Sequence, residues 1–129
     1  MWPFLFLIRI KEKSLVSRFQ SLKKTREFQS VYQSGHSKVN RLFVMLVKKN
    51  NKPYNRVGIS VSKKVGNSIV RHRVTREIRE ILRLHWEETE QGYDIVIVAR
   101  NSAKESDYHK FESALLHLLR LHHLLKNID

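Results

Sequence analysis

Strand-like patterns of apolar residues occupy the middle of the chain. Residues 42–48, LFVMLVK, form a nearly continuous apolar run, which is typical of a buried strand. Residues 56–63, RVGISVSK, alternate between β-branched residues at 57, 59 and 61 and small or polar residues at 58, 60 and 62. The turn-forming sequence NNKPYN lies between the two segments and favours an antiparallel hairpin. Residues 93–100, YDIVIVAR, predict another strand, and a short one can be accommodated near 36–41.

Helical periodicity predicts three helices around these strands. Residues 25–35, TREFQSVYQSG, begin with Thr25 as a capping residue and repeat apolar or aromatic side chains at i, i+3 and i+4. A long helix is predicted from Asn67 or Ser68 to about Trp86, and a last helix from roughly 107 to 126. The order αβββαβα, with the short strand included, predicts a single small α+β domain with a sheet of about four strands.

The long helix separates apolar from cationic residues. At about 100° per residue, its apolar side chains fall within roughly 120° of arc, and this stripe is expected to pack on the sheet. A basic row falls within roughly 60° on the opposite side. The apolar stripe contains Val70, Val74, Ile78, Ile81 and Leu82, the basic row contains His72, Arg76, Arg79 and Arg83, and Arg71 and Arg73 flank the two faces.

A solvated face is the plain alternative for such a charge run. Arg73–Glu77 and Arg76–Glu80 are pairs at i and i+4, but pairs of this kind contribute only a few tenths of a kcal/mol. They leave Arg79, Arg83, Lys63 and Lys64 without local partners. Arginine favours planar, bidentate contacts with phosphate. The loop SKKVGN, with Lys63, Lys64 and Asn67, adds cations and free backbone N–H groups beside the start of the helix.

Composition strengthens the nucleic-acid interpretation. The chain has 129 residues, with 25 Lys and Arg against 12 Asp and Glu, which gives a formal charge of +13. A small domain with this charge repels itself unless a polyanion neutralises it, and nucleic acid is a better candidate than an anionic membrane surface. The absence of cysteine excludes disulfides, cysteine-linked partners and thiolate metal sites, and it fits an intracellular protein.

The first ten residues, MWPFLFLIRI, form an apolar run that is too short to span a bilayer. Its positive charges follow the apolar stretch, which is the reverse of their order in a secretory signal. Residues 1–16 are therefore interpreted as an unstructured or misassigned leader before a domain at 17–129. One hypothesis is that translation starts near Leu15 or Val16.

The assembled motifs resemble the protein component of bacterial ribonuclease P. The resemblance is carried by GISVSKKVGNSIVRHRVTREIRE at 58–80, LKKTREFQSVYQSG at 22–35, GYDIVIVAR at 92–100 and ESALLHLLR at 112–120. It runs from about Phe19 to Leu125, in the same order. The chain departs from the family signature at His72, in an Asn position, and at Thr75, in a Lys position, whereas Arg71, Arg73 and Arg76 are retained.

The resemblance implies a function that sequence patterns alone do not give. The family's protein joins a catalytic RNA that holds the Mg²⁺ ions and removes the 5′ leader of precursor tRNA in the cytoplasm. The protein itself then has no catalytic residue, and no membrane partner is expected. The implied fold is a mixed sheet with an unusual left-handed βαβ crossover. The implied RNA-facing residues are Lys63, Lys64, Asn67, Arg71, His72, Arg73, Arg76, Arg79 and Arg83, and the implied leader cleft contains Phe28, Tyr32, Phe43 and Met45.

Other functions are less well supported by the residues. His117, His122 and His123 lack the i, i+4 spacing of a helical metal site, and the acidic residues do not cluster as a Mg²⁺ nuclease centre requires. No metal site is therefore expected in the protein. The alternatives that remain open are a ribosomal or assembly-type RNA-binding protein, a protein-only Mg²⁺ endonuclease, and a DNA-binding module whose arginine helix enters the major groove.

Overall fold

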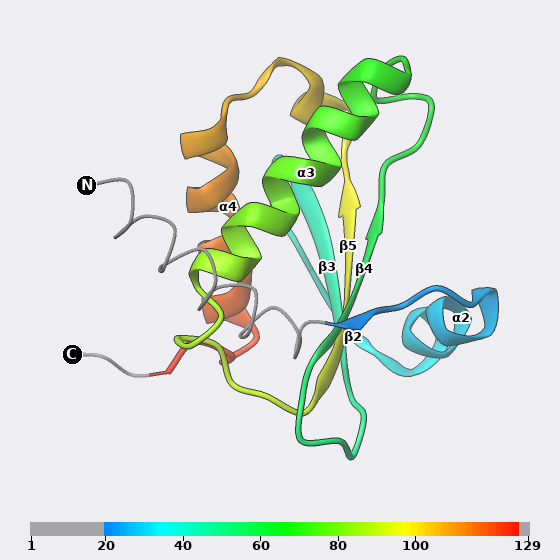
Figure 1. Cartoon of the computed structure of the whole chain (residues 1–129), viewed down its shortest axis with the longest axis vertical. Helices are drawn as coiled ribbons and strands as arrows, with labels where there is room; N and C mark the ends of the chain where they lie inside the picture. The colour runs from blue at the N-terminus through cyan, green and yellow to red at the C-terminus, as the bar shows by residue number, and fades with distance from the viewer. Residues whose placement is uncertain (1–19, 127–129) are drawn as a thin grey trace, which may run out of the picture.

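The computed structural model describes residues 20–126 as one α+β unit (Figure 1). The predicted leader at 1–16 lies outside the described residues. The order of elements is β1 (Gln20–Ser21), α2 (Thr25–Ser34), β2 (His36–Val39), β3 (Phe43–Lys49), β4 (Arg56–Ser60), α3 (Ser68–Leu84), β5 (Tyr93–Ala99), the 3-10 helix η1 (Asn101–Glu105) and α4 (Tyr108–Leu121). The predicted order αβββαβα is confirmed, and the two-residue β1 brings the sheet to five strands rather than four.

The sheet is mixed, and its central strand is the last one in the sequence. The strand order is β1-β4-β5-β3-β2, with β5 parallel to β4 and antiparallel to β3. The predicted hairpin between residues 42–48 and 56–63 is therefore wrong. Although NNKPYN reverses the chain direction, β5 inserts between β3 and β4 and takes the hydrogen bonds of both.

The connection from β4 to β5 runs through α3. In Figure 1 both strands point upward, α3 lies in front of the sheet, and β5 lies to the left of β4. This arrangement is a left-handed crossover, which departs from the right-handed rule for parallel neighbours. The basic helix follows β4 in the chain. The loop at 62–67 therefore leaves the sheet at the C-terminal end of β4 and leads into α3.

Helices cover both faces of the sheet, which explains why its central strands are apolar throughout. Figure 1 shows α2 on one side and α3 with α4 on the other. The larger core cluster joins alternate residues of β3, β4 and β5 to α3 and α4, and includes Phe43, Ile97 and Phe111. A smaller cluster joins the intervening residues, among them Leu46 and Val96, to α2. Successive residues of a strand point to opposite faces of the sheet, so alternate side chains pack against α2 or against α3 and α4.

Local signals set the starts of the helices. Asn67, one of the two residues from which the helix was expected to start, caps α3, because its Oδ1 accepts from the backbone N–H of Val70 at 3.0 Å. Asp107 caps α4 in the same way through the N–H of Lys110, at 2.9 Å. Helix α2 differs from the prediction, since Thr25 is its first residue and Lys24 holds the cap position. There Glu27 Oε1 accepts from the backbone N–H groups of Lys23 and Lys24.

The last helix ends earlier than its apolar stripe predicts. It stops at Leu121, and His123 adopts a positive φ of 58°, so the chain turns back over the core. Leu124 is buried there, and Leu125 forms an isolated bridge with Thr89. Within residues 20–126, no helix is both long enough and apolar enough to cross a membrane.

Candidate nucleic-acid interface

The outward face of α3 carries the predicted basic row. Val74, Ile78, Ile81 and Leu82 are buried against the sheet and α4, which confirms the predicted apolar stripe. His72, Arg76 and Arg79 are exposed on the other side of the helix, and Arg83 is partly exposed. The helix therefore presents cations to solvent along several turns while its opposite face anchors it.

Two arginines of this helix also have local partners. Arg73 lies 3.4 Å from Glu77 and donates to the backbone oxygen of Lys104 at 3.2 Å, which ties α3 to η1. Glu80 lies 3.9 Å from Arg83 rather than pairing with Arg76 as expected. The expectation that Arg83 lacks a local partner is therefore wrong. Pairs of this length and exposure are weak, so they orient the side chains more than they neutralise them.

The helix start adds exposed lysines to the same end of the molecule. Lys63 and Lys64 are exposed at the centre of a turn, and Val65, between them and the helix, is fully buried. Val65 acts as an anchor, and its N–H donates to the Ser62 oxygen at 3.0 Å. Lys64 borders a shallow hollow of about 450 Å³ that is also lined by Arg100. Sequence reasoning missed Arg100, because it lies in a segment read only as a strand.

The two positions that depart from the family signature have different environments. Thr75 is half-buried, and its hydroxyl donates to the Arg71 backbone oxygen at 2.9 Å, within the helix. His72 is exposed and free to meet a ligand. Arg71 is partly buried, and its Nε has no hydrogen-bond partner among residues 20–126.

The second candidate surface lies beside α2. Phe28 is half-buried against the sheet, and its ring covers Gly58 of β4: a Cβ added to Gly58 would lie 2.6 Å from two of the ring carbons. Tyr32 is 47% exposed one turn further along α2. The structure thus keeps one predicted aromatic as a wall of this surface and leaves the other open to solvent.

Phe43 and Met45 do not belong to this surface, and their predicted place in a cleft beside α2 is wrong. Both are 0% exposed and pack in the larger core under α3 and α4. Phe43 makes an edge-on contact with the Phe111 ring of α4, with ring centroids 5.2 Å apart. They point to the opposite face because successive residues of a strand alternate in direction.

The strand residues that do face α2 include Val44, which lies between those two in sequence, and its partners on the neighbouring strands. Val44 and Val98 are half-buried beside Phe28, and Val39, which pairs with Val44, is 53% exposed. Ser60 pairs with Val98 and completes this row across the sheet. An open apolar row next to Phe28 and Tyr32 is suited to stacking of unpaired bases.

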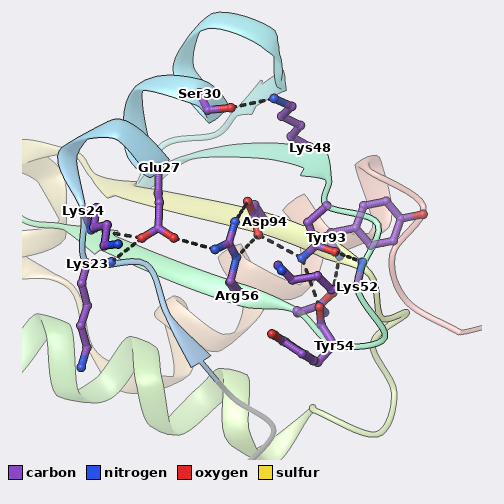
Figure 2. A network of polar contacts seen from close by, with 12 residues as sticks. Lys23, Lys24, Glu27, Ser30, Lys48, Lys52, Tyr54, Arg56, Tyr93 and Asp94 are labelled. Carbon is purple, nitrogen blue, oxygen red and sulfur yellow. Dashed lines mark hydrogen bonds and ion pairs between the residues drawn. The ribbon is translucent and has the colours of Figure 1, made fainter.

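An ion-pair network fixes α2 against the sheet at the other end of this face. Figure 2 shows Arg56 between Glu27 of α2 and Asp94 of β5, and it contacts both carboxylates at 2.6 Å. Asn50 donates to Asp94 at 3.0 Å, and Lys48 donates to the Ser30 hydroxyl at 2.6 Å. These contacts hold α2 and its aromatic residues in a defined position.

The network also shifts the acidities of its carboxyl groups. The pKa of Glu27 is lowered, first by the backbone N–H of Lys24 and further by Arg56. Burial raises the pKa of Asp94, but hydrogen bonds from Arg56 and Asn50 outweigh burial and leave this pKa below its ordinary value. Both groups are therefore charged near neutral pH.

No group of three or more histidine or acidic side chains that could hold a metal ion occurs within residues 20–126. The interface is thus built from cations and aromatic or apolar surface.

Comparisons with known proteins agree with this architecture. Residues 16–123 match the family described as Ribonuclease P. The ribonuclease P protein component of Lachnoclostridium phytofermentans is 50% identical over 110 residues, covering 85% of this chain and 95% of the relative. That of Alkaliphilus metalliredigens is 50% identical over 99 residues, covering 77% and 89%. The solved RNase P protein of Staphylococcus aureus superposes with a TM-score of 0.77 at 36% identity, covering 82% of this chain and 97% of that one.

Proposed function

Because this chain belongs to the ribonuclease P protein family, we propose that it is the protein subunit of a ribonuclease P that matures the 5′ ends of tRNAs. In this role it binds a catalytic RNA and the leader of precursor tRNA, and it works in the cytoplasm. The observation that carries the proposal is the exposed basic row of α3, which lies opposite the stripe that anchors the helix. Such a row neutralises phosphates without disturbing the core.

The two surfaces have separate tasks in this proposal. The catalytic RNA lies along α3 and the loop before it, with phosphates at Arg71, Arg73, Arg76, Arg79 and Arg83, His72, Asn67, Lys63 and Lys64. The leader lies beside α2, where Tyr32 and Phe28 offer aromatic faces and the row of Val39, Val44 and Val98 offers an apolar floor. A single strand held by stacking needs no particular sequence, which suits leaders of many tRNAs.

Catalysis is assigned to the RNA. Hydrolysis of a phosphodiester by metal ions requires a clustered set of oxygen ligands, and we assign the Mg²⁺ ions to the RNA partner. The protein then contributes binding energy: its charge lowers repulsion between the two RNAs, and this reduces the Mg²⁺ concentration that the reaction needs.

The test is cleavage of a precursor tRNA with a 5′ leader at low Mg²⁺. A bacterial ribonuclease P RNA is assayed with and without the full chain, beside a protein-alone control. Cleavage that requires both components supports the proposal, and a gain that disappears when the leader is trimmed assigns the α2 surface to the substrate. Cleavage by the protein alone would contradict it. Tight RNA binding without any effect on cleavage would favour a ribosomal or assembly role instead.

A further inference from the structure

A second cationic hollow lies at the end of the sheet away from the loop at 62–67. It has a volume of about 540 Å³ and is formed where β2, the end of β3, the start of β5 and the end of α4 meet. Lys49 pairs with Tyr93 at this end, whereas Ser60, just before the loop, pairs with Val98 at the other end. The hollow is therefore separate from both surfaces described above.

Six lysine and histidine side chains line this hollow, none of its lining residues is acidic, and five of the six direct their nitrogens to its side of the sheet. These five are His36, Lys38, Lys49, His122 and His123. His36 and Lys38 lie opposite Val47 and Met45, whose side chains pack in the larger core, so both point to the α4 side of the sheet. Lys48 also borders the hollow, but its ammonium group bonds to Ser30 on the other face.

His122 forms the inner wall of the hollow and has a fixed orientation. Its Nε2 donates to the backbone oxygen of Met45 at 2.9 Å, so Nδ1 is the nitrogen that takes up a proton. Burial lowers the pKa of His122, the bond to Met45 opposes that effect, and the charges of Lys38, His36 and His123 lower the pKa further. The groups thus converge closely enough to repel one another, and a bound anion would relieve the repulsion.

Apolar surface lies beside these charges. Tyr93 and Leu121 border the hollow, Leu121 is 40% exposed, and Val47 is buried at its floor. A concave site with cations at one side and aromatic and aliphatic surface at the other matches a phosphate joined to a planar base.

We propose that this hollow binds a nucleotide unit, with its phosphate at Lys38, Lys49 and the histidines and its base against Tyr93 and Leu121. The unit is either a free nucleotide or one residue of an RNA strand that reaches this end of the protein. The proposal does not depend on the proposed function, because it is tested by direct binding and not by tRNA cleavage.

The experiment follows the histidine Cε1–H resonances of the full chain by NMR at pH 6.5. The probes are adenosine 5′-monophosphate and a 5′-phosphorylated penta-adenylate. We expect the resonances of His36, His122 and His123 to shift with the mononucleotide. His72 on α3 reports independently on RNA bound to the other surface.

Two matched double variants test the assignment. Lys38→Ala with Lys49→Ala removes two exposed cations from the hollow, and binding should weaken about two- to thirtyfold, since each exposed ion pair contributes about 0.2–1 kcal/mol. Lys110→Ala with Lys126→Ala removes the same charge from exposed positions outside the hollow and should leave these shifts unchanged.

Each outcome decides the proposal. Shifts with both probes support a site for a single nucleotide unit, and shifts with penta-adenylate alone support a site for a nucleotide within RNA. Unchanged resonances of His36, His122 and His123 with both probes would overturn it, as would an equal loss of affinity in the control variant.

Discussion

The ring of Phe28 lies directly over Gly58, so that the helix α2 approaches the sheet at a position where only glycine leaves room. A Cβ on residue 58 would stand 2.6 Å from the Cε1 and Cζ atoms of Phe28 and 3.2 Å from the Cβ of Leu22. The half-buried aromatic wall of the α2 surface therefore depends on a missing side chain in β4.

Gly58→Ala is expected to displace Phe28 and to destabilise the protein by about 1–3 kcal/mol, the usual cost of overpacking a filled site. Urea unfolding measures the loss. The control is Ser60→Ala, two residues along the same face of β4, where alanine keeps the Cβ that serine already has. If both variants unfold at the same urea concentration, the contact between Gly58 and Phe28 does not limit the packing of α2.

Replacing Arg76 and Arg79 with alanine should weaken RNA binding while leaving folding intact, because both side chains are exposed on the outer face of α3. Each lost phosphate contact lowers the slope of log affinity against log salt by about 0.7 to 0.9. Binding of the catalytic RNA is measured between low and moderate salt. Arg26→Ala with Lys110→Ala, which removes two exposed cations from other helices, is the matched control. An unchanged slope in the α3 variant would mean that RNA binds a different face.

His85 should make the contact between α3 and α4 sensitive to pH. Its Nδ1 lies 2.5 Å from Glu88 and its Nε2 lies 2.7 Å from Glu112, so both ring nitrogens donate to carboxylates. Burial lowers the pKa of His85, but the bonds to Glu112 and Glu88 outweigh burial and raise this pKa above its ordinary value of 6.5.

A raised pKa means that the folded state holds the proton more tightly than the unfolded chain does. The resulting stability is complete below pH 6.5 and is lost as pH rises through the folded-state pKa. Thermal unfolding of the parent and of His85→Gln at pH 6 and pH 9 should therefore differ most at the lower pH. His72→Gln, at an exposed position, serves as the control. Equal pH profiles for the parent and His85→Gln would show that the two carboxylates do not hold a charged ring.

Arg56→Met should destabilise the protein by about 2–3 kcal/mol, because it leaves the buried Asp94 carboxylate without its cation. The expected loss is below that of a fully buried pair, since the Arg56 side chain is 20% exposed. The pKa of Asp94 lies below 3.8, so this stabilisation is present above that pH and disappears as pH falls through the folded-state value. The effect is measured by urea unfolding at pH 7 and pH 3.

Glu27→Gln is the matched control for Arg56→Met, since it alters the more exposed partner of the same arginine. We expect a smaller loss from it at pH 7. A loss in Glu27→Gln that equals the loss in Arg56→Met would show that the link to α2, and not the charge of Asp94, provides the stability.

The sequence predicts the orientation of α3 well, because the 3.6-residue period of a single helix is enough to separate its buried face from its exposed face. Val74 and Ile78 are buried and Arg76 and Arg79 exposed, as the spacing requires. The N-cap was predictable to within one residue, at Asn67 or Ser68, since a cap acts on residues two or three positions away, and the structure has it at Asn67.

The orientation of β3 is not encoded in this local way. Residues 42–48 are almost uniformly apolar because helices cover both faces of the strand. The sequence therefore has no alternation of apolar and polar residues that would show which side chains face α2. The sequence is therefore compatible with Phe43 and Met45 in the cleft, although Val44 is the residue that faces α2. The hairpin between β3 and β4 was mispredicted because the competing partner, β5, lies more than thirty residues further along the chain.

The central position of β5 also sets the order in which the chain can acquire its structure. As residues leave the ribosome from the N-terminus onward, β3 and β4 are made before the strand that hydrogen-bonds to both. The pairs that close the sheet join residues as distant as Phe43 and Ala99, and contacts of such separation form slowly. A nascent chain that stops before Tyr93 therefore has β3 paired only with β2 and β4 paired only with β1, and the two halves of the sheet join only after synthesis has passed Ala99.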